Sequence, residues 1–135
     1  MKLEDSVAIA SAGMKTQGVR IRVAAENLAN ASSTGTHAGE EPYRRKTVSF
    51  AERLDRERQL RLVDVKRYGV DNSAFERRFD PTHPAADGAG YVLWPNVNPL
   101  VELMDMREAQ RSYEANLNAI TLTRNLVRQT LDLLR

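Results

Sequence analysis

The chain has 135 residues, a formal net charge of +2 and no cysteine. This length fits one domain, or one helical domain that carries a small insertion, and the lack of cysteine excludes disulfides, thiolate catalysis and cysteine-ligated metal sites. No run of about 18 apolar residues exists to span a membrane, and the acids Glu4 and Asp5 without an apolar run behind them indicate no cleaved signal peptide.

A helix is predicted at the N-terminus, because apolar and small residues recur there at alternating spacings of three and four. Asp5 and Ser6 are expected to cap its start, and the polar run 30–35 is expected to end it. Gly13 and Gly18 each weaken an isolated helix by about 1 kcal/mol relative to alanine, so this helix needs a partner. Its seam consists of Ala10, Met14, Gln17, Ile21, Ala24, Leu28 and Ala31.

The middle segment, residues 36–97, has turn-prone dipeptides and short runs of β-forming residues. These runs predict strands at Lys46–Phe50, Gln59–Tyr68, Arg77–Phe79 and Tyr91–Trp94. So few short strands indicate a small β-rich unit that is weakly stable by itself.

A second helix is predicted from Pro99 to the end of the chain, about 55 Å long at 1.5 Å per residue. Asn98 is a suitable N-cap, and proline is favourable at the first helical position. An unbroken heptad seam runs along this helix. Its positions are Leu103, Met106, Gln110, Tyr113, Leu117, Ile120, Arg124, Val127, Leu131 and Leu134.

The predicted fold is therefore mainly α with a small β insertion. Residues 1–35 and 98–135 are expected to form one domain in which the terminal helices pair as a coiled coil, with residues 36–97 as an inserted domain. The polar seam residues Gln17, Gln110 and Arg124 lower stability and fix register, or they face neighbouring subunits.

Motifs that carry chemistry are nearly absent. Asp80, His83 and Asp87 could bind a divalent metal or act as acids and bases, but a turn scaffold explains the same aspartates and their neighbouring prolines. No nucleophile motif and no phosphate-binding glycine pattern occurs. We therefore expect no catalytic residue, no cofactor, no bound metal and no enzymatic activity.

Residues 44–67 carry a net charge of +5. Such a segment suits nucleic acid, an acidic protein face, or a solvated surface in which acids are interleaved with the bases. A nucleic-acid-binding protein is thus one hypothesis, testable by the salt dependence of binding; we expect no nucleic-acid partner.

Several motifs resemble those of the bacterial flagellar axial proteins, and most specifically the FlgC-type proximal rod proteins of the flagellar basal body. Residues 26–31, Glu-Asn-Leu-Ala-Asn-Ala, are similar to the family's NLANA signature. Residues 42–46, the run 80–92 with Pro-Asn-Val-Asn at 95–98, and the helical stretch 111–116 are similar to further family motifs. The resemblance covers nearly the whole chain.

The resemblance implies a structural subunit of the periplasmic rod, exported by the flagellar type III apparatus without a cleaved signal. Its implied partners are other rod subunits, copies of itself and the adaptor proteins between MS ring and rod. Export through a narrow channel favours termini that fold on assembly, which suits the weak N-terminal seam. The residues expected at subunit contacts are Asn27, Leu28, Asn30, Tyr43, Arg44, Tyr113, Glu114 and Asn116.

An alternative is a coiled-coil adaptor or chaperone of a secretion system, which binds a partner's helix and never polymerises. This alternative predicts stable helices in isolation and a finite stoichiometry. The rod hypothesis predicts mobile termini in the monomer and open-ended assembly.

Overall fold

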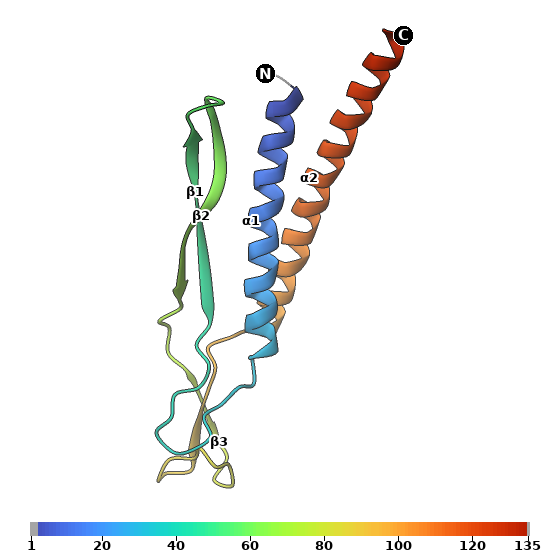
Figure 1. Cartoon of the computed structure of the whole chain (residues 1–135). Helices are drawn as coiled ribbons and strands as arrows, with labels where there is room; N and C mark the ends of the chain where they lie inside the picture. Colours follow the sequence, from blue (N-terminus) through green and yellow to red (C-terminus); the bar gives the residue numbers. More distant parts are fainter. Residues whose placement is uncertain (1–2, 135) are drawn as a thin grey trace. The chain divides into compact units, whose positions relative to one another are not determined.

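A computed structural model describes residues 3–134 and contains two helices and four strands (Figure 1). The order of these elements along the chain is α1 (Leu3–Ala29), β1 (Lys46–Asp55), β2 (Leu60–Val70), β3 (Glu76–Phe79), β4 (Tyr91–Trp94) and α2 (Pro99–Leu133). The predicted helices flanking a β-rich middle segment are therefore confirmed. The prediction that the two helices form a coiled coil is not confirmed.

Helix α1 begins earlier than the sequence predicts. The expected caps Asp5 and Ser6 lie inside the helix, and the acids of its first turn are Glu4 and Asp5. Acidic side chains are favourable there because unpaired N–H groups make a helix N-terminus positive, so these residues fit the first turn as well as a cap. The end of α1 falls at Ala29, where the side chain of Asn30 donates to the Glu26 carbonyl at 2.9 Å.

The strands form two separate two-stranded sheets, β1 with β2 and β3 with β4. In the first hairpin the Asp55 carboxylate accepts hydrogen bonds from the N–H groups of Glu57 and Arg58, at 3.1 and 3.2 Å, and Gln59 takes the left-handed conformation at φ 53°. The second sheet is antiparallel, with Glu76 opposite Trp94 and Phe79 opposite Tyr91.

The turn between β3 and β4 is a compact hydrogen-bonded loop. The Asp80 N–H donates to the Gly90 carbonyl at 2.9 Å. Gly90 has φ 82°, and a Cβ built on it would lie 3.0 Å from the ring of Phe79, so only glycine suits this position. The loop joins two strands of four residues each.

Helix α2 begins at Pro99, as predicted. The Asn98 side-chain oxygen accepts hydrogen bonds from the N–H groups of Leu100 and Val101, at 3.1 and 3.4 Å. This is the N-cap geometry that satisfies the unpaired donors of a first turn. The helix then continues to Leu133 without a break.

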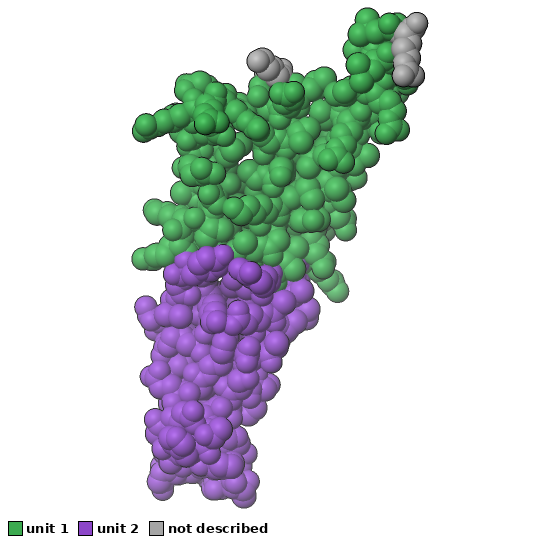
Figure 2. Space-filling view, viewed as in Figure 1, with its two compact units in different colours: residues 1–21, 48–67, 107–135 green, residues 22–47, 68–106 purple. Residues whose placement is uncertain are grey.

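The chain divides into two compact units (Figure 2), and each cuts across the secondary structure. Unit 1 contains residues 1–21, 48–67 and 107–135, and unit 2 contains residues 22–47 and 68–106. Both helices and the β1–β2 hairpin contribute to both units. The predicted division into a helical domain and an inserted domain stays a prediction about how these segments fold.

The core is thin and built from small side chains. The buried hydrophobic residues are Ala10, Val23, Ala24, Val92 and Ala109. Among the described residues 3–134, the buried polar side chains are those of Thr16, Asn27 and Glu102. Burial removes these polar side chains from water, so they need hydrogen-bond partners within the protein.

Candidate functional site

In unit 2, Asn27 of α1 is fully buried and holds three segments of the chain together. Its Oδ1 accepts hydrogen bonds from the Tyr43 hydroxyl at 2.9 Å and from the Lys46 N–H at 2.8 Å. Its Nδ2 donates to the Lys46 carbonyl at 2.9 Å and to a Glu102 carboxylate oxygen at 3.3 Å. These four bonds use the whole hydrogen-bonding capacity of an asparagine amide.

Glu102, in the first turn of α2, is 1% exposed and pairs with the guanidinium of Arg45. A carboxylate is favourable at this end of a helix, and the guanidinium offsets the cost of burying its charge. We call Asn27, Tyr43, Arg45, Lys46 and Glu102 the Asn27 cluster.

Asn96 extends the Asn27 cluster toward the strands. Its Oδ1 accepts the Arg45 N–H at 2.8 Å, and its Nδ2 donates to the Asp71 carbonyl at 2.9 Å. The two asparagines of the Pro-Asn-Val-Asn motif therefore have separate tasks: Asn96 joins backbone segments and Asn98 caps α2.

Burial of its hydroxyl, followed by the nearby carboxylate of Glu26, raises the pKa of Tyr43. Tyr43 is therefore a neutral hydrogen-bond donor to Asn27 at physiological pH.

Most of the residues predicted at subunit contacts are engaged within the chain. Arg44 lies over the Phe75 ring at 4.2 Å and donates to the Asp71 carbonyl at 3.1 Å. Asn30 bonds the end of α1 and also accepts from Ser33 at 3.0 Å. Leu28 is half-buried.

The remaining predicted contact residues lie on α2. Tyr113 and Glu114 are exposed, whereas Asn116 is half-buried against α1. A Cβ added to Gly13 would lie 2.9 Å from the Asn116 amide, so the helices of unit 1 approach closely at this point. The structure thus brings Asn27 and Tyr43 together and leaves Tyr113 and Glu114 on the surface.

Sequence reasoning missed Arg45, Asn96 and Glu102 as site residues. Arg45 and Asn96 lie within the motifs at 42–46 and 95–98, whereas no sequence pattern singled out Glu102. The signal that could have identified it is a carboxylate in a helix's first turn combined with the basic run before β1, but these lie 57 positions apart along the chain.

The candidate metal residues serve as turn scaffolds instead. Within residues 3–134, no group of three or more His, Asp or Glu side chains is arranged to hold a metal ion. His83 Nδ1 accepts the Ala85 N–H at 3.0 Å, and its Nε2 lies 3.2 Å from the Thr34 hydroxyl. Hydrogen bonds, chiefly from the Thr82 side chain to Asp80 and from the Tyr91 N–H to Asp87, hold the pKa values of both carboxyls below their ordinary range.

The face of α2 that the chain buries coincides with the predicted seam only in part, at the half-buried Met106 and Ile120. Glu102 and Ala109 are buried, and the half-buried residues Ser112, Asn116 and Thr123 continue this line along the helix. Most of the predicted seam lies one position further along and is exposed. We call its exposed apolar residues the α2 stripe, which consists of Leu103, Tyr113, Leu117, Val127, Leu131 and Leu134, with exposed fractions from 36% to 79%.

By contrast, the predicted seam of α1 does face inward. Ala10 and Ala24 are buried, and Met14, Ile21 and Leu28 are half-buried. Gln17 is also half-buried, and its Oε1 is buried without a hydrogen-bond partner in the described part of the chain. The small residues of α2 therefore pack on α1, whereas most of its larger apolar residues stay exposed, with Met106 and Ile120 half-buried.

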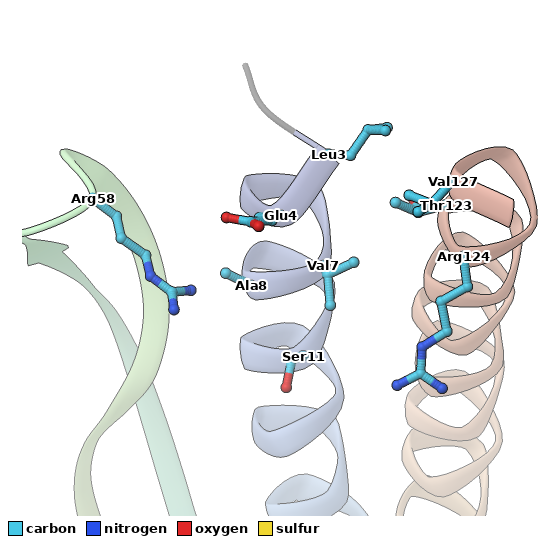
Figure 3. A pocket seen from close by; sticks show the side chains of 9 residues that line it. All are labelled: Leu3, Glu4, Val7, Ala8, Ser11, Arg58, Thr123, Arg124 and Val127. Carbon is cyan, nitrogen blue, oxygen red and sulfur yellow. The ribbon is translucent and has the colours of Figure 1, made fainter. Parts of the chain in front are cut away.

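A cleft of about 730 Å³ opens in unit 1 over the first turns of α1 (Figure 3). Figure 3 shows α1 between the β1–β2 turn on one side and α2 on the other. The cleft residues are Leu3, Glu4, Val7, Ala8 and Ser11 from α1, Arg58 from the turn, and Thr123, Arg124 and Val127 from α2.

The described residues combine two long helices and a buried polar junction with an exposed apolar stripe, features common in proteins that assemble with others. No helix of the described residues is long and apolar enough to cross a membrane.

Comparison with known proteins identifies the family. A family model described as "Flagellar basal body rod FlgEFG protein C-terminal" matches residues 89–133. The flagellar basal-body rod protein FlgC of Agrobacterium fabrum is 52% identical over 94% of this chain and 91% of its own length. Those of Salmonella typhimurium and Bacillus subtilis are 35% and 34% identical, over 93% and 95% of this chain and 92% and 95% of their own lengths.

The chain belongs to the FlgC family of flagellar basal-body rod proteins. This family is one of structural proteins rather than enzymes, its members are located in the flagellar basal body, and membership implies association with other rod components.

Proposed function

We propose that the chain is a subunit of the proximal rod, which polymerises through its terminal helices into the shaft that transmits torque to the flagellum. The observation that carries this proposal is the α2 stripe. Six large apolar side chains recur at heptad spacing along one face of a 35-residue helix and remain exposed in the single chain. Exposed apolar rows of this extent are typical of surfaces that a partner covers.

The Asn27 cluster gives the second part of the proposal. Torque passes through a subunit only if its helices keep their positions, and this cluster fixes the end of α1 to the start of α2 and to β1. We assign Asn27, Asn30, Tyr43, Arg44 and Asn116 the role of holding the contact surfaces in place.

Leu28, Tyr113 and Glu114 are the predicted contact residues that we propose touch neighbouring subunits directly. Tyr113 belongs to the α2 stripe, and Glu114 is exposed beside it. In the rod, we propose, α1 and α2 pair as a coiled coil. A neighbouring subunit then covers the α2 stripe. The close approach of Gly13 to Asn116 and the 3.4 Å ion pair of Arg20 with Glu108 support this pairing within unit 1.

The subunit is exported by the flagellar type III apparatus without a cleaved signal, and it joins other rod subunits and the MS-ring adaptor proteins in the periplasm. Its thin core supports folding that is completed on assembly, since little apolar surface is buried before a neighbour arrives.

The test is complementation of a strain that lacks this gene, with the chain and two variants of α2. Leu117→Asp places a charge in the α2 stripe, whereas Leu122→Asp places one at a similarly apolar exposed position, 61% exposed, outside it. We expect the unaltered chain and Leu122→Asp to restore motility and to be found in isolated basal bodies, and Leu117→Asp to do neither. An unaltered chain that restores motility but is absent from basal bodies would favour the adaptor hypothesis instead.

A further inference from the structure

One buried polar atom of unit 1 has no hydrogen-bond partner. Among residues 3–134, the Oε1 of Gln17 is the single buried side-chain nitrogen or oxygen without one. The Nε2 of the same amide makes no hydrogen bond within these residues either, so exchanging the two amide atoms would not satisfy the buried position. Folded proteins seldom leave such an atom unpaired, because nothing replaces the hydrogen bond to water that burial removes.

The position of Gln17 makes this cost avoidable. Gln17 lies in the seam of α1 between the half-buried Met14 and Ile21, where an apolar side chain would need no partner. The adjacent Thr16, which is 2% exposed, is satisfied within its own helix, because its hydroxyl donates to the Gly13 carbonyl at 2.9 Å. A polar residue in a helical seam costs stability and fixes register or partner choice. In the single chain the cost of Gln17 is present, and the partner is not.

The seam of α2 offers a matching amide. Gln110 belongs to this seam, is exposed, and makes no hydrogen bond within the described part of the chain. A neighbour that covers the α2 stripe would bury this amide, which then needs partners of its own. Arg124, the other polar position of the seam, matches less well, because its cation would be buried against a neutral amide. Two amides can form two reciprocal hydrogen bonds, since each has a donor and an acceptor.

The spacing of apolar neighbours fits the same pair. Along α1, apolar seam residues stand three positions before Gln17 and four positions after it. Along α2, they stand four positions before Gln110 and three positions after it. The two orders are mirror images, so antiparallel helices would bring the apolar neighbours into register when the amides meet.

We infer that Gln17 of one copy pairs with Gln110 of a second copy, and that this pair forms only on assembly. The inference rests on the proposed rod function and names the helix that covers the α2 stripe at this point. Gln17 is half-buried, so rotation of its side-chain torsions is sufficient to turn the amide toward a neighbour. Because α1 of one copy meets α2 of the next, the contact is heterologous and can be repeated from copy to copy.

The first test compares the single chain with the rod. Gln17→Met removes the amide but keeps an unbranched side chain, and should raise the melting temperature of the purified chain by about 3 °C, because no amide is then left unpaired. As the only form in a strain that lacks the gene, the same variant should be incorporated into basal bodies about tenfold less, because Gln110 of its neighbour loses a partner. Gln129→Met, at an exposed glutamine of α2, is the matched control and should change neither quantity.

The double variant Gln17→Met with Gln110→Met supplies the reciprocal test. Gln110→Met alone should leave the melting temperature unchanged, since this side chain is exposed, but should also lower incorporation about tenfold. The double variant buries no unpaired amide in the rod, and removing both partners of a hydrogen bond is nearly neutral. Its incorporation should therefore return close to that of the unaltered chain.

Disulfide cross-linking shows whether the pair joins two copies, because the chain has no cysteine of its own. Chains with Gln17→Cys and Gln110→Cys carry different tags and are expressed together, and the isolated basal bodies are oxidised mildly. We expect the 17–110 product, which carries both tags, in large excess over the 17–129 product obtained when Gln129→Cys replaces Gln110→Cys.

Three results would overturn the inference: an unchanged melting temperature for Gln17→Met, a double variant incorporated no better than either single variant, or exclusive cross-linking of position 17 to a different rod protein. Each of them leaves the proposed rod function standing if the unaltered chain is present in basal bodies and restores motility. Absence of the unaltered chain from basal bodies would instead refute the proposed function itself.

Discussion

The amide nitrogen of Asn27 lies 3.3 Å from the carboxylate of Glu102, and these two side chains are 0% and 1% exposed. The contact joins the last turns of α1 to the first turn of α2 across 75 positions of the sequence. A buried amide bonded to a buried carboxylate is stable only while every other partner is in place. The first two predictions follow from this dependence.

Replacing Asn27 with leucine should destabilise the chain by about 3 kcal/mol, because it leaves buried polar groups without partners. The Lys46 N–H, the Tyr43 hydroxyl and the Glu102 carboxylate would each lose a bond. Urea unfolding followed by circular dichroism measures the change. The control is Asn125→Leu on α2, an exposed asparagine, where a change within about 0.5 kcal/mol is expected; equal effects at both positions would contradict the role of Asn27.

Arg45→Met should cost about 3 kcal/mol, because it leaves the Glu102 carboxylate buried without its cation. Adding Glu102→Met should recover part of that loss, since the double variant no longer buries a charge. Arg61→Met is the matched control, because its ion pair with Glu52 is exposed at both ends and is expected to contribute less than about 1 kcal/mol. A double variant less stable than Arg45→Met alone would show that the pair contributes more than charge compensation.

Two glycines of α1 provide a matched test of helix packing. Gly18→Ala should stabilise the chain by up to about 1 kcal/mol, because alanine is the better helix former and a Cβ there meets nothing within 4 Å. Gly13→Ala gains the same propensity but displaces the Asn116 amide, whose nitrogen donates to the Ser112 carbonyl at 2.9 Å. We expect Gly13→Ala to be about 1 kcal/mol less favourable than Gly18→Ala.

Thermal unfolding of the two glycine variants gives the comparison. Asn116→Ala combined with Gly13→Ala should remove most of the difference, because the obstructing amide is then gone. If both alanine variants stabilise the chain equally, the helices of unit 1 do not approach closely at Gly13.

The turn at residues 80–91 should make the free energy of unfolding depend on pH in the acidic range. The Tyr91 N–H, then the Ala89 N–H and the cation of Arg77, hold the pKa of Asp87 below its ordinary value. The folded state thus binds fewer protons than the unfolded state, so this contribution is complete above about pH 5 and is lost as the pH falls through the folded pKa. Urea midpoints measured from pH 6 down to pH 3 should fall less steeply for Asp87→Asn than for the unaltered chain; an unchanged slope would contradict the assignment.

Local sequence patterns predict the elements of this fold well, because heptads and short β-forming runs report local preferences. The strand predicted at Lys46–Phe50 is β1, which extends to Asp55, and α2 begins at Pro99 as the Asn98 cap indicates. The start of α1 was placed too late, because Asp5 is equally suited to a cap and to a first turn.

The face that α2 buries was harder to predict. A heptad of leucines shows that a helix has an apolar stripe but not whether the covering partner belongs to the same chain. Within one chain, Ala109 and Asn116 allow the closer approach to α1, so the bulkier Leu117 remains outside. The Asn27 cluster could likewise not be predicted from local sequence patterns, because its members come from three segments that are distant in the sequence.

The most direct test of the account is the solvent accessibility of the α2 stripe in the single chain and in the rod. Leu117→Cys and Leu122→Cys are labelled with a water-soluble maleimide, first in the purified chain and then in isolated basal bodies that contain it. We predict that both cysteines react in the purified chain, and that in basal bodies position 117 is protected far more than position 122. Equal labelling of position 117 in both preparations would show that no neighbouring subunit covers the stripe, and would contradict assembly through this face.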